Sequence, residues 1–454
     1  MHSSNCPVFR FACMWSLLTG LFLVGGSPTW AAAPTCGDST EADVFPAPAN
    51  ENVTTIAEGG VWTWFNDERA VFVDSTLYVG YVDNCGQAAV TAYPLGEAGR
   101  LRTVLSSFRE VDDHDNPAFA QLDDGRLLAT YAMHSVENHW YWRTKEPGAF
   151  RWLPEEQTAS VGAAVTYTNL FQLSTEDGRI YNFFRGLNFD PTLMTSDDGA
   201  STWSEPQHVI KSGGGGTRPY VKYVSDGEDR IDLFYTQGHP QELDARTNVY
   251  HLYYQNGTLH ESDGTEICAT DASDCLPVNY SAGTLVYEAN DALGRGWVWD
   301  VEYTESGEPV GVFTTKIGKK TNNELHYHYA RYDGATDQWQ EKRIAPAGDQ
   351  LYDTQYHYAG GISIDPAHPD TVYASGNVDP ASGAETTQYQ LYRGVTNDDG
   401  ETWSWTKLTS ASVDNLRPFV PRSDEGHHAV LWFRGEYSSY SDYDTDIVGL
   451  IGSQ

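Results

Sequence analysis

Thr195-Ser196-Asp197-Asp198-Gly199-Ala200-Ser201-Thr202-Trp203 is the stretch of the sequence that decides the fold, and Thr396-Asn397-Asp398-Asp399-Gly400-Glu401-Thr402-Trp403 repeats its design. Each stretch has a pair of aspartates and a glycine, and closes with threonine and tryptophan. The glycine allows a tight turn, an aspartate can accept hydrogen bonds from turn amides, and the tryptophan packs into the sheet beyond. The sequence therefore predicts the same β-hairpin at two distant places.

Short strand-like segments fill the rest of the chain. Residues 76–81, 126–131 and 231–235 are of strand length and rich in aromatic or β-branched residues, and Asp/Gly turns separate such segments. Weaker copies of the hairpin end at Trp152 and Trp339. No amphipathic helix of three turns is found, so the sequence predicts an all-β protein.

The spacing of the hairpins predicts a ring of blades. The copies that end at Trp152 and Trp203 lie about fifty residues apart, so roughly 420 residues would make seven or so four-stranded blades. The 28 tyrosines, 14 tryptophans and 42 glycines against 4 methionines fit many short aromatic strands joined by tight turns. A pair of β-sandwiches is the alternative. We expect residues 34–454 to form a single seven-bladed β-propeller, with the glycine run 212–216 as a loop at the rim of its cleft.

The first 33 residues predict an export signal. Arg10 supplies a basic start, residues 14–24 an apolar core that is short for a spanning helix of about 20 residues, and residues 31–33 a cleavage site of small residues. An uncleaved membrane anchor is the alternative. We expect a secreted or periplasmic protein with no later transmembrane segment.

The formal net charge of −35 narrows the choice of partners. Such a field repels nucleic acids and anionic membranes, so neither is expected as a partner. It also favours solubility in a salty exterior. An anionic substrate would need a locally basic cleft inside this acidic shell. We expect the protein to be a monomer.

Four cysteines remain once the signal is removed. They are Cys36, Cys85, Cys268 and Cys275. An exported chain can pair them, and the simplest solution is two bridges, Cys36 to Cys85 and Cys268 to Cys275. The alternative for the second pair is a structural metal, zinc rather than calcium, because His251 and His260 would complete a tetrahedral set of two thiolates and two imidazoles.

Residues 111–169 hold many groups that exchange protons or bind sugars. The stretch contains Asp112-Asp113-His114-Asp115-Asn116-Pro117, Met133-His134-Ser135 and Thr166-Tyr167-Thr168-Asn169. Polar groups at the starts of strands in successive blades converge on one central face of a propeller. We therefore expect this stretch to form the floor of an active site. The alternatives are an ion-paired turn for His114 and a core position for Tyr167.

Several motifs carry a resemblance to a known family. They are Trp62-Thr63-Trp64-Phe65-Asn66-Asp67-Glu68-Arg69, Asp113-His114-Asp115-Asn116-Pro117, Thr166-Tyr167-Thr168-Asn169, Phe184-Arg185-Gly186, Thr217-Arg218-Pro219-Tyr220-Val221-Lys222-Tyr223 and Gly238-His239-Pro240. In these motifs the chain resembles BNR-repeat propellers, and its hairpins resemble the Asp boxes of sialidase-type propellers. Within that group it is most similar to ulvan lyases of polysaccharide lyase families 24 and 25. The spacing of His114 and His134 favours family 25.

The resemblance implies a central canyon that holds a sulfated rhamnose–uronate polymer. His114 and His134 match two histidines of that canyon, and Arg185 matches the arginine that meets the uronate carboxylate. Tyr167 matches a catalytic tyrosine, with Tyr181 as a rival for that place. No organic cofactor is implied, and a bound metal would be structural.

Elimination at a 4-linked uronate needs three kinds of group. A cation must neutralise the carboxylate so that the C5 proton can leave, and Arg185 suits this role because its fork binds both oxygens, with Arg218 as second candidate. A base then takes the C5 proton and an acid protonates the departing O4. We expect His114 and Tyr167 to be this pair, with His134 positioning the sugar or sharing the proton transfer. Which member is the base stays open.

Further cleft residues are expected to bind hydroxyl or sulfate groups of the polymer. They are Asn116, Asn169, Arg218, Tyr220 and His239.

Two other functions remain open. A glycoside hydrolase such as an α-L-rhamnosidase would use two carboxylates beside the bond, which Asp113 and Asp115 could offer in part. A sialidase would use an arginine triad that Arg69, Arg185 and Arg218 could mimic. A non-catalytic carbohydrate-binding propeller would show tryptophan platforms without a convergent set of histidine, tyrosine and arginine.

Overall fold

The computed structural model describes residues 53–96, 99–212, 218–240, 247–317, 325–352, 355–422 and 426–453, together with the backbone of residues 43–45. The expected export signal, Cys36 and most of the glycine run 212–216 lie outside these residues. The predicted bridge between Cys36 and Cys85 therefore lies outside them as well.

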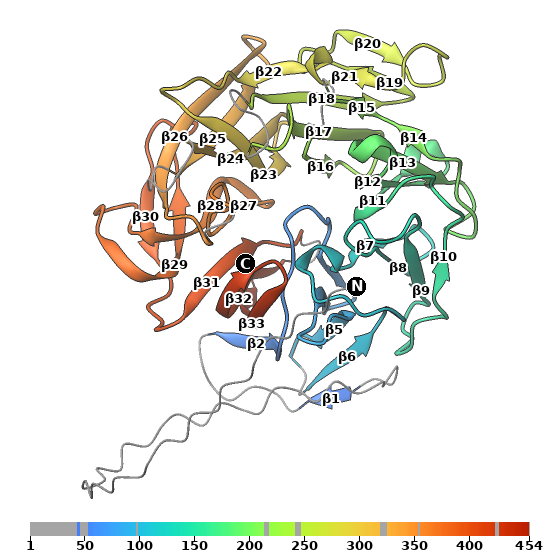
Figure 1. Ribbon diagram of the computed structural model, residues 1–454, viewed down its shortest axis with the longest axis horizontal. Coiled ribbons are helices and arrows are strands. Elements are labelled where there is room, and N and C mark those ends of the chain that lie inside the picture. Colours follow the sequence, from blue (N-terminus) through green and yellow to red (C-terminus); the bar gives the residue numbers. More distant parts are fainter. Residues whose placement is uncertain are drawn as a thin grey trace, which may run out of the picture. The chain divides into compact units, whose positions relative to one another are not determined.

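Seven antiparallel sheets follow one another around a central axis (Figure 1), which confirms the predicted seven-bladed β-propeller. Blade 1 consists of β3 (Ala70–Val73), β4 (Thr76–Val82), β5 (Ala88–Pro94) and β6 (Arg100–Val104), with β1 (Asp43–Phe45) paired to β6. Blade 2 consists of β7 (Ala118–Gln121), β8 (Leu127–Tyr131), β9 (Tyr141–Lys145) and β10 (Glu156–Gln157). Blade 3 consists of β11 (Thr166–Leu173), β12 (Arg179–Arg185), β13 (Pro191–Ser196) and β14 (Gln207–His208).

Blade 4 is the largest sheet. It consists of β16 (Val221–Ser225), β17 (Arg230–Thr236), β18 (Val249–Gln255), β19 (Thr258–His260) and β20 (Glu266–Ala269), with β22 (Thr284–Tyr287) also paired to β18. The short strands β15 (Ile210–Lys211) and β21 (Val278–Asn279) form a separate parallel pair.

The remaining blades complete the ring. Blade 5 consists of β23 (Arg295–Tyr303), β24 (Pro309–Lys316), β25 (Leu325–Asp333) and β26 (Gln338–Gly348). Blade 6 consists of β27 (Ile362–Asp365), β28 (His368–Val378), β29 (Glu385–Val395) and β30 (Ser404–Lys407). Blade 7 consists of β31 (Asp414–Phe419), β32 (His427–Ser439), β33 (Asp442–Ser453) and β2 (Thr54–Ala57). Single 3-10 turns are η1 (Asp113–Asp115), η2 (Ser174–Glu176), η3 (Leu187–Phe189) and η4 (Tyr280–Ala282).

Strands from near both ends of the described chain close the ring in blade 7. Strand β2 pairs with the last strand, β33, through Thr54 opposite Gly449 and Thr55 opposite Val448. A propeller closed in this way leaves no blade to separate at a seam, because β2 and the last strand belong to one sheet. Within the described residues no helix is long and apolar enough to span a membrane.

The two paired-aspartate stretches form the same hairpin turn, as predicted. The Asp198 carboxylate accepts hydrogen bonds from the Thr202 amide at 2.8 Å and the Thr202 hydroxyl at 2.6 Å. Asp398 accepts the same two bonds from Thr402 at the same distances. The glycine of the first stretch, Gly199, has φ +68°, a conformation that favours glycine. The repeat therefore forms a structural turn, and its residues stabilise the scaffold.

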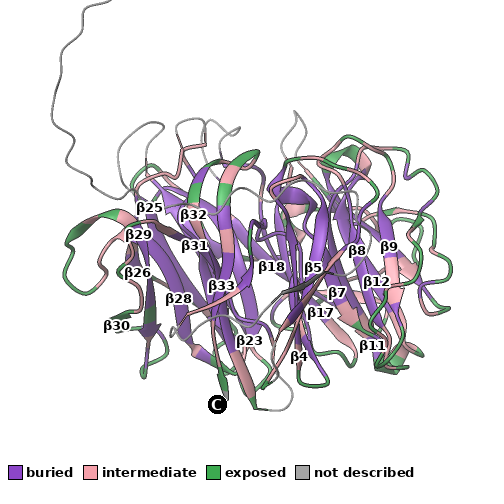
Figure 2. Ribbon diagram, turned by 90° about the horizontal axis from the view of Figure 1, so that it is seen from below, coloured by how far each residue is buried: buried purple, intermediate pink, exposed green. Residues whose placement is uncertain are grey.

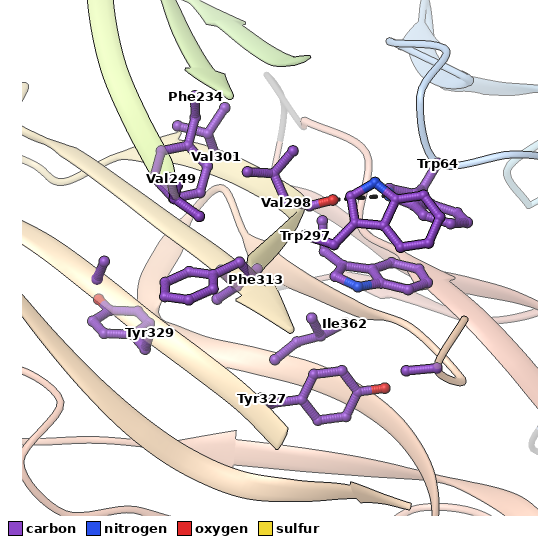
Figure 3. Packing of buried hydrophobic residues seen from close by; sticks show 14 of the residues in the cluster. Trp64, Phe234, Val249, Trp297, Val298, Val301, Phe313, Tyr327, Tyr329 and Ile362 are labelled. Atoms are coloured by element: carbon purple, nitrogen blue, oxygen red, sulfur yellow. Dashed lines mark hydrogen bonds between the residues drawn. The ribbon is translucent and has the colours of Figure 1, made fainter. Parts of the chain in front are cut away.

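Buried aromatic side chains fill the interior near the axis. The burial pattern in Figure 2 places buried residues along the blades and exposed ones at the loops. In the largest cluster Trp64 stacks on Trp299 with ring centroids 3.9 Å apart. The indole N–H of Trp64 donates to the Val298 carbonyl at 3.0 Å (Figure 3). Trp64 precedes β3 whereas Trp299 lies in β23 of blade 5, so this packing joins distant parts of the ring across its centre.

Candidate active site

His114 and His134 lie together, as expected. Nδ1 of His114 lies 2.5 Å from Oδ1 of Asp112, and Nδ1 of His134 lies 2.8 Å from Oδ2 of the same carboxylate. The two imidazole rings stack, with centroids 3.9 Å apart and planes 12° apart. Asp112 is held in place because it caps η1, where it accepts a hydrogen bond from the His114 amide at 3.0 Å. One carboxylate thus orients both rings.

The two histidines differ in charge. Burial lowers the pKa of His114, but the charges of Asp112 and Asp113 outweigh it and raise the pKa to about 9. Burial and the charge of His114 lower the pKa of His134 to about 4. At neutral pH His114 is an imidazolium and His134 is neutral. Since Nδ1 of His134 faces Asp112, that nitrogen carries the proton and Nε2 keeps a lone pair.

Asp113 connects η1, which carries His114, to blade 7. Its Oδ2 accepts hydrogen bonds from Arg417 Nη1 at 2.5 Å and from the Tyr437 hydroxyl at 2.6 Å, and Arg417 Nη1 also donates to the Trp62 carbonyl at 2.7 Å. Arg417 and Asp113 are each 1% exposed at the side chain. Arg417 could not be predicted as a partner of Asp113, because 304 residues separate the two in the chain.

Tyr440, which follows β32, is a second site residue that no sequence pattern indicated. Its ring meets His114 and His134 edge-on, with centroids 5.4 and 5.8 Å away. The Tyr440 carbonyl accepts a hydrogen bond from the Asp113 amide at 2.8 Å. Nothing in the local sequence around Tyr440 distinguishes it from the other 27 of the 28 tyrosines.

Asn116 and Asn169 serve the scaffold, which corrects their predicted role in substrate binding. The Asn116 side chain is fully buried, accepts from the Thr63 amide at 3.0 Å and donates to the Pro117 carbonyl at 3.3 Å. Asn169 accepts from the Asp67 amide at 3.1 Å and donates to the Phe183 carbonyl at 3.1 Å. Both amide groups already use their donor and acceptor on the backbone of neighbouring segments.

Arg185, at the end of β12, is held by hydroxyl groups. Nη2 donates to Thr166 Oγ1 at 2.9 Å and to Ser135 Oγ at 3.1 Å, and Nη1 donates to the Tyr220 hydroxyl at 3.2 Å. The guanidinium carbon lies 4.9 Å from the centroid of the Tyr167 ring. No carboxylate of the described residues pairs with Arg185. The site therefore contains an oriented cation without a carboxylate partner among the described residues.

Tyr167 stands between the histidines and Arg185. Its ring centroid lies 5.4 Å from that of His114, and its backbone has φ +66°, at a point where the pairing of β11 with β12 shifts register. Such a backbone is unusual for a tyrosine and is typical of functional sites. Burial, followed by the neighbouring phenol of Tyr220, raises the pKa of Tyr167 well above 10. Tyr167 therefore carries its proton at neutral pH.

Tyr181, the rival of Tyr167, belongs to another part of blade 3. Its hydroxyl donates to Glu176 Oε2 at 2.5 Å and lies 2.9 Å from the Tyr254 hydroxyl. Neither partner belongs to the site around Arg185. The geometry therefore favours Tyr167 over Tyr181.

Arg218, Tyr220 and His239 extend the site along blade 4. Nε of Arg218 donates to the Tyr220 hydroxyl at 3.2 Å, and the His239 ring lies 5.3 Å from the Tyr220 ring. Burial and the charges of Arg218 and Arg185 lower the pKa of His239 to about 3. With the His114 imidazolium, these arginines make the cleft locally basic inside a protein of net charge −35. Such a field suits an anionic ligand.

The predicted metal ligands do not form a metal site. Cys268 and Cys275 form a disulfide, so neither sulfur is a thiolate, and the bridge is the correct one of the two alternatives. His251 is buried, with Nδ1 2.8 Å from Ser262 Oγ and Nε2 2.7 Å from Asp232 Oδ1. His260 stacks on the Tyr253 ring at 4.9 Å. The zinc set of His251, His260, Cys268 and Cys275 is therefore wrong.

One other group of residues has the spacing of metal ligands. Single ligand atoms of Asp112, His114 and His134 lie within 4.8 Å of one another. Both Nδ1 atoms are already engaged by the Asp112 carboxylate, and the positive charge of His114 opposes a cation. This donor set fits proton transfer better than metal binding.

Comparisons with known proteins agree with this architecture. A sequence model of the BNR repeat-containing family matches residues 76–347. No curated protein matches the chain. Among solved structures, an ulvan lyase of polysaccharide lyase family 25 bound to -[GlcA(1-4)Rha3S]- is similar, with a TM-score of 0.63 and 14% sequence identity over 88% of this chain and 97% of that one.

Two further structures show the same fold. The polysaccharide lyase Uly1 has a TM-score of 0.57 and 12% identity, over 86% of this chain and 90% of that one. The lectin BP39L from Burkholderia pseudomallei has a TM-score of 0.51 and 10% identity, over 83% of this chain and 93% of that one. The resemblance to BNR-repeat propellers that include ulvan lyases is thereby confirmed at the level of the fold. The family match over more than half of the sequence shows that this chain belongs to the BNR repeat-containing family.

Proposed function

We propose that the protein is a polysaccharide lyase that cleaves ulvan, a sulfated rhamnose–uronate polymer, by β-elimination at its 4-linked uronate. The observation that carries this proposal is Arg185, a buried guanidinium that three hydroxyls orient and that no carboxylate of the described residues neutralises. Beside it stand two proton carriers, Tyr167 and His114. The similar family 25 structure, described as bound to a glucuronate–rhamnose sulfate segment, supports the choice of polymer.

The Arg185 fork would bind the uronate carboxylate. Its positive charge stabilises the negative charge that builds on the carboxylate as the C5 proton leaves, and this is the main electrostatic contribution to the reaction. The charge of His114 adds to the same field. Because Tyr167 carries a proton at neutral pH, it suits the acid that protonates the departing O4.

Hydrolysis has less support from the geometry. Asp113 is committed to Arg417 and Tyr437, and Asp115 is fully buried, with a pKa that burial and the charge of Glu110 raise well above its ordinary value. Neither offers a carboxylate beside a sugar, whereas hydrolysis usually uses two.

A sialidase-like arginine triad is also not assembled. Arg69 is 2% exposed, pairs with Asp67 at 2.8 Å, and lies 4.1 Å from the Phe419 ring centroid. Of Arg69, Arg185 and Arg218, only Arg185 and Arg218 share a partner, because both donate to the Tyr220 hydroxyl.

Ultraviolet absorbance during incubation with ulvan tests the proposal. Elimination creates a conjugated double bond at the new uronate end, so absorbance should rise with the wild-type protein and stay flat with Arg185→Ala. New reducing ends without this rise would indicate hydrolysis. Binding of ulvan without either product would indicate a carbohydrate-binding propeller, as in the lectin of similar fold.

Export and a monomeric state complete the proposal. An enzyme that acts on an extracellular polymer must lie outside the cytoplasm, which agrees with the signal expected over residues 1–33. Amino-terminal sequencing of the protein recovered from periplasm or medium should begin near residue 34. Light scattering of the purified protein should give the mass of a single chain.

A further inference from the structure

The proposed elimination needs a base that has no proton before the substrate arrives. His114 is an imidazolium at neutral pH, and Tyr167 keeps its phenolic proton. His134 has a free lone pair on Nε2, but its pKa of about 4 makes it a weak base. His114 and Tyr167 therefore supply protons rather than remove them, and His134 is a poor base.

Two guanidinium groups converge on the phenolic oxygen of Tyr220. Nη1 of Arg185 and Nε of Arg218 each donate to this oxygen at 3.2 Å. None of the described residues accepts a hydrogen bond from the Tyr220 hydroxyl. An oxygen that only accepts, and accepts from two cations, is stabilised as an anion. The geometry thus favours a phenolate at this position.

The charged groups around Tyr220 also favour the phenolate. Burial raises the pKa of the phenol, but Arg185 and Arg218, with a contribution from His114, outweigh it and hold the pKa below 10. The two titratable groups packed against the ring add no negative charge at neutral pH. Tyr167, at 6.3 Å between centroids, is a neutral phenol, and His239, at 5.3 Å, is a neutral imidazole.

Tyr220 also lies in the same cavity as the groups with which it would act. Tyr167, Arg185 and Tyr220 line the same pocket, and Phe65 and Pro219 form part of its wall. A uronate carboxylate on Arg185 would therefore lie beside both phenols, because Arg185 donates to the Tyr220 hydroxyl and its guanidinium carbon lies 4.9 Å from the Tyr167 ring centroid. One phenol carries a proton and the other is poised to accept one.

We propose that Tyr220, as a phenolate between Arg185 and Arg218, is the base that removes the C5 proton. This inference rests on the proposed lyase function and gives Tyr220 a chemical role beyond the cleft binding expected from the sequence. The C5–H electron pair forms the C4–C5 double bond as the C4–O4 bond breaks. The C5 proton moves to Tyr220, and O4 takes the proton of Tyr167. Transfer of a proton from Tyr220 to Tyr167, directly or through solvent, restores both groups.

A titration of the free protein tests the ionisation without any substrate. The near-ultraviolet absorbance of tyrosinate should show one tyrosine that ionises well before the others. This early step should vanish in Tyr220→Phe and persist in the matched control Tyr181→Phe, whose phenol donates to Glu176. Circular dichroism of both variants confirms that they are folded. An early step that persists in Tyr220→Phe, or is absent from the wild type, overturns the proposal.

Kinetics test the catalytic role. Tyr220→Phe should lower kcat by about 10²- to 10⁴-fold, the usual contribution of a general base, with a much smaller change in KM. Activity of the wild type should fall as the pH drops through the pKa of Tyr220, and Arg218→Gln should move that fall to higher pH because one cation is lost. A loss confined to KM, with an unchanged pH profile, would mean that Tyr220 only positions Arg185 and would overturn the proposal.

The kinetic outcomes also separate this inference from the function on which it rests. Elimination that survives at full rate in Tyr220→Phe overturns the role of Tyr220 alone. Absence of elimination by the wild-type protein on ulvan overturns the lyase function and the role of Tyr220 with it.

Discussion

The imidazole rings of His114 and His134 stack with centroids 3.9 Å apart, and only one of them carries a charge at neutral pH. Their separation is small enough that protonation of one opposes protonation of the other. Asp112 contacts both rings, and His114 has a second carboxylate, Asp113, at 3.0 Å. That second contact explains why the proton stays on His114.

Asp112→Asn should lower the pKa of His114, although Asp113 still contacts the ring. The Asp112 carboxylate is the negative charge that stabilises the imidazolium most. Its loss should therefore lower the pKa of His114 toward its ordinary value. NMR titration of the histidine ring protons measures this fall directly. Activity should drop by about 10²-fold or more, because the proposed reaction uses the charge and orientation of His114. Asp124→Asn, which removes an exposed carboxylate paired with Arg126, is the control and should change neither quantity.

Arg185→Lys should retain a charge and still lose most activity. Lysine cannot reproduce the planar fork that three hydroxyls orient, and it binds a carboxylate through one point. We expect kcat/KM on ulvan to fall by about 10²- to 10³-fold, the size of effect seen when one oriented donor to a developing charge is lost. Arg179→Lys, at a surface arginine paired with Asp197, controls for the substitution itself. Equal activities of the two variants would contradict the role of Arg185.

Arg417→Met should destabilise the protein by about 3–5 kcal/mol, because it leaves Asp113 as a buried carboxylate without its cation. Urea unfolding of both proteins measures the difference. The double variant Arg417→Met with Asp113→Asn should recover part of the loss, since no unpaired charge is then buried. Equal stability of the single and double variants would show that the unpaired Asp113 carboxylate costs nothing and would contradict this prediction.

Stability should decline at alkaline pH through His114. The pKa of His114 in the folded protein, about 9, exceeds its ordinary value of 6.5, so its contribution is fully present below pH 6.5 and is lost as the pH rises through 9. Linkage sets this contribution at about 3 kcal/mol at most. Thermal unfolding between pH 7 and pH 10 should show a smaller decline in His114→Gln than in the wild type. His134 is uncharged in both states over this range and does not interfere.

Reduction of the disulfide should affect stability more than catalysis. The bridge between Cys268 and Cys275 closes a loop of sequence separation 7, for which chain entropy predicts about 2–3 kcal/mol. The double variant Cys268→Ser with Cys275→Ser should unfold at lower urea concentration and keep the kcat of the wild type. Zinc added to reduced wild-type protein should not restore stability, because His251 is committed to Ser262 and Asp232.

Local patterns carried much of what could be predicted. The paired-aspartate turns at Asp198 and Asp398 depend on residues within a few positions of one another, so the sequence alone revealed them. The spacing of the copies that end at Trp152 and Trp203 then predicted the propeller. His114 lies two residues from Asp112, and this short separation also made the charged turn recognisable. The choice between a disulfide and zinc at Cys268 and Cys275 stayed open because both arrangements suit the same sequence.

The tertiary structure alone decided which polar groups are available for chemistry. Asn116 and Asn169 have the right residue type for sugar binding. Their side-chain oxygens, however, accept hydrogen bonds from the backbone amides of residues 63 and 67. Arg417 reaches Asp113 only because the ring closes, and Arg185 and Arg218 meet at Tyr220 only because blades 3 and 4 are adjacent. Charge and hydrogen bonding depend on distance in space, so the protonation of His114, His134 and Tyr220 could not be predicted before the blades were in place.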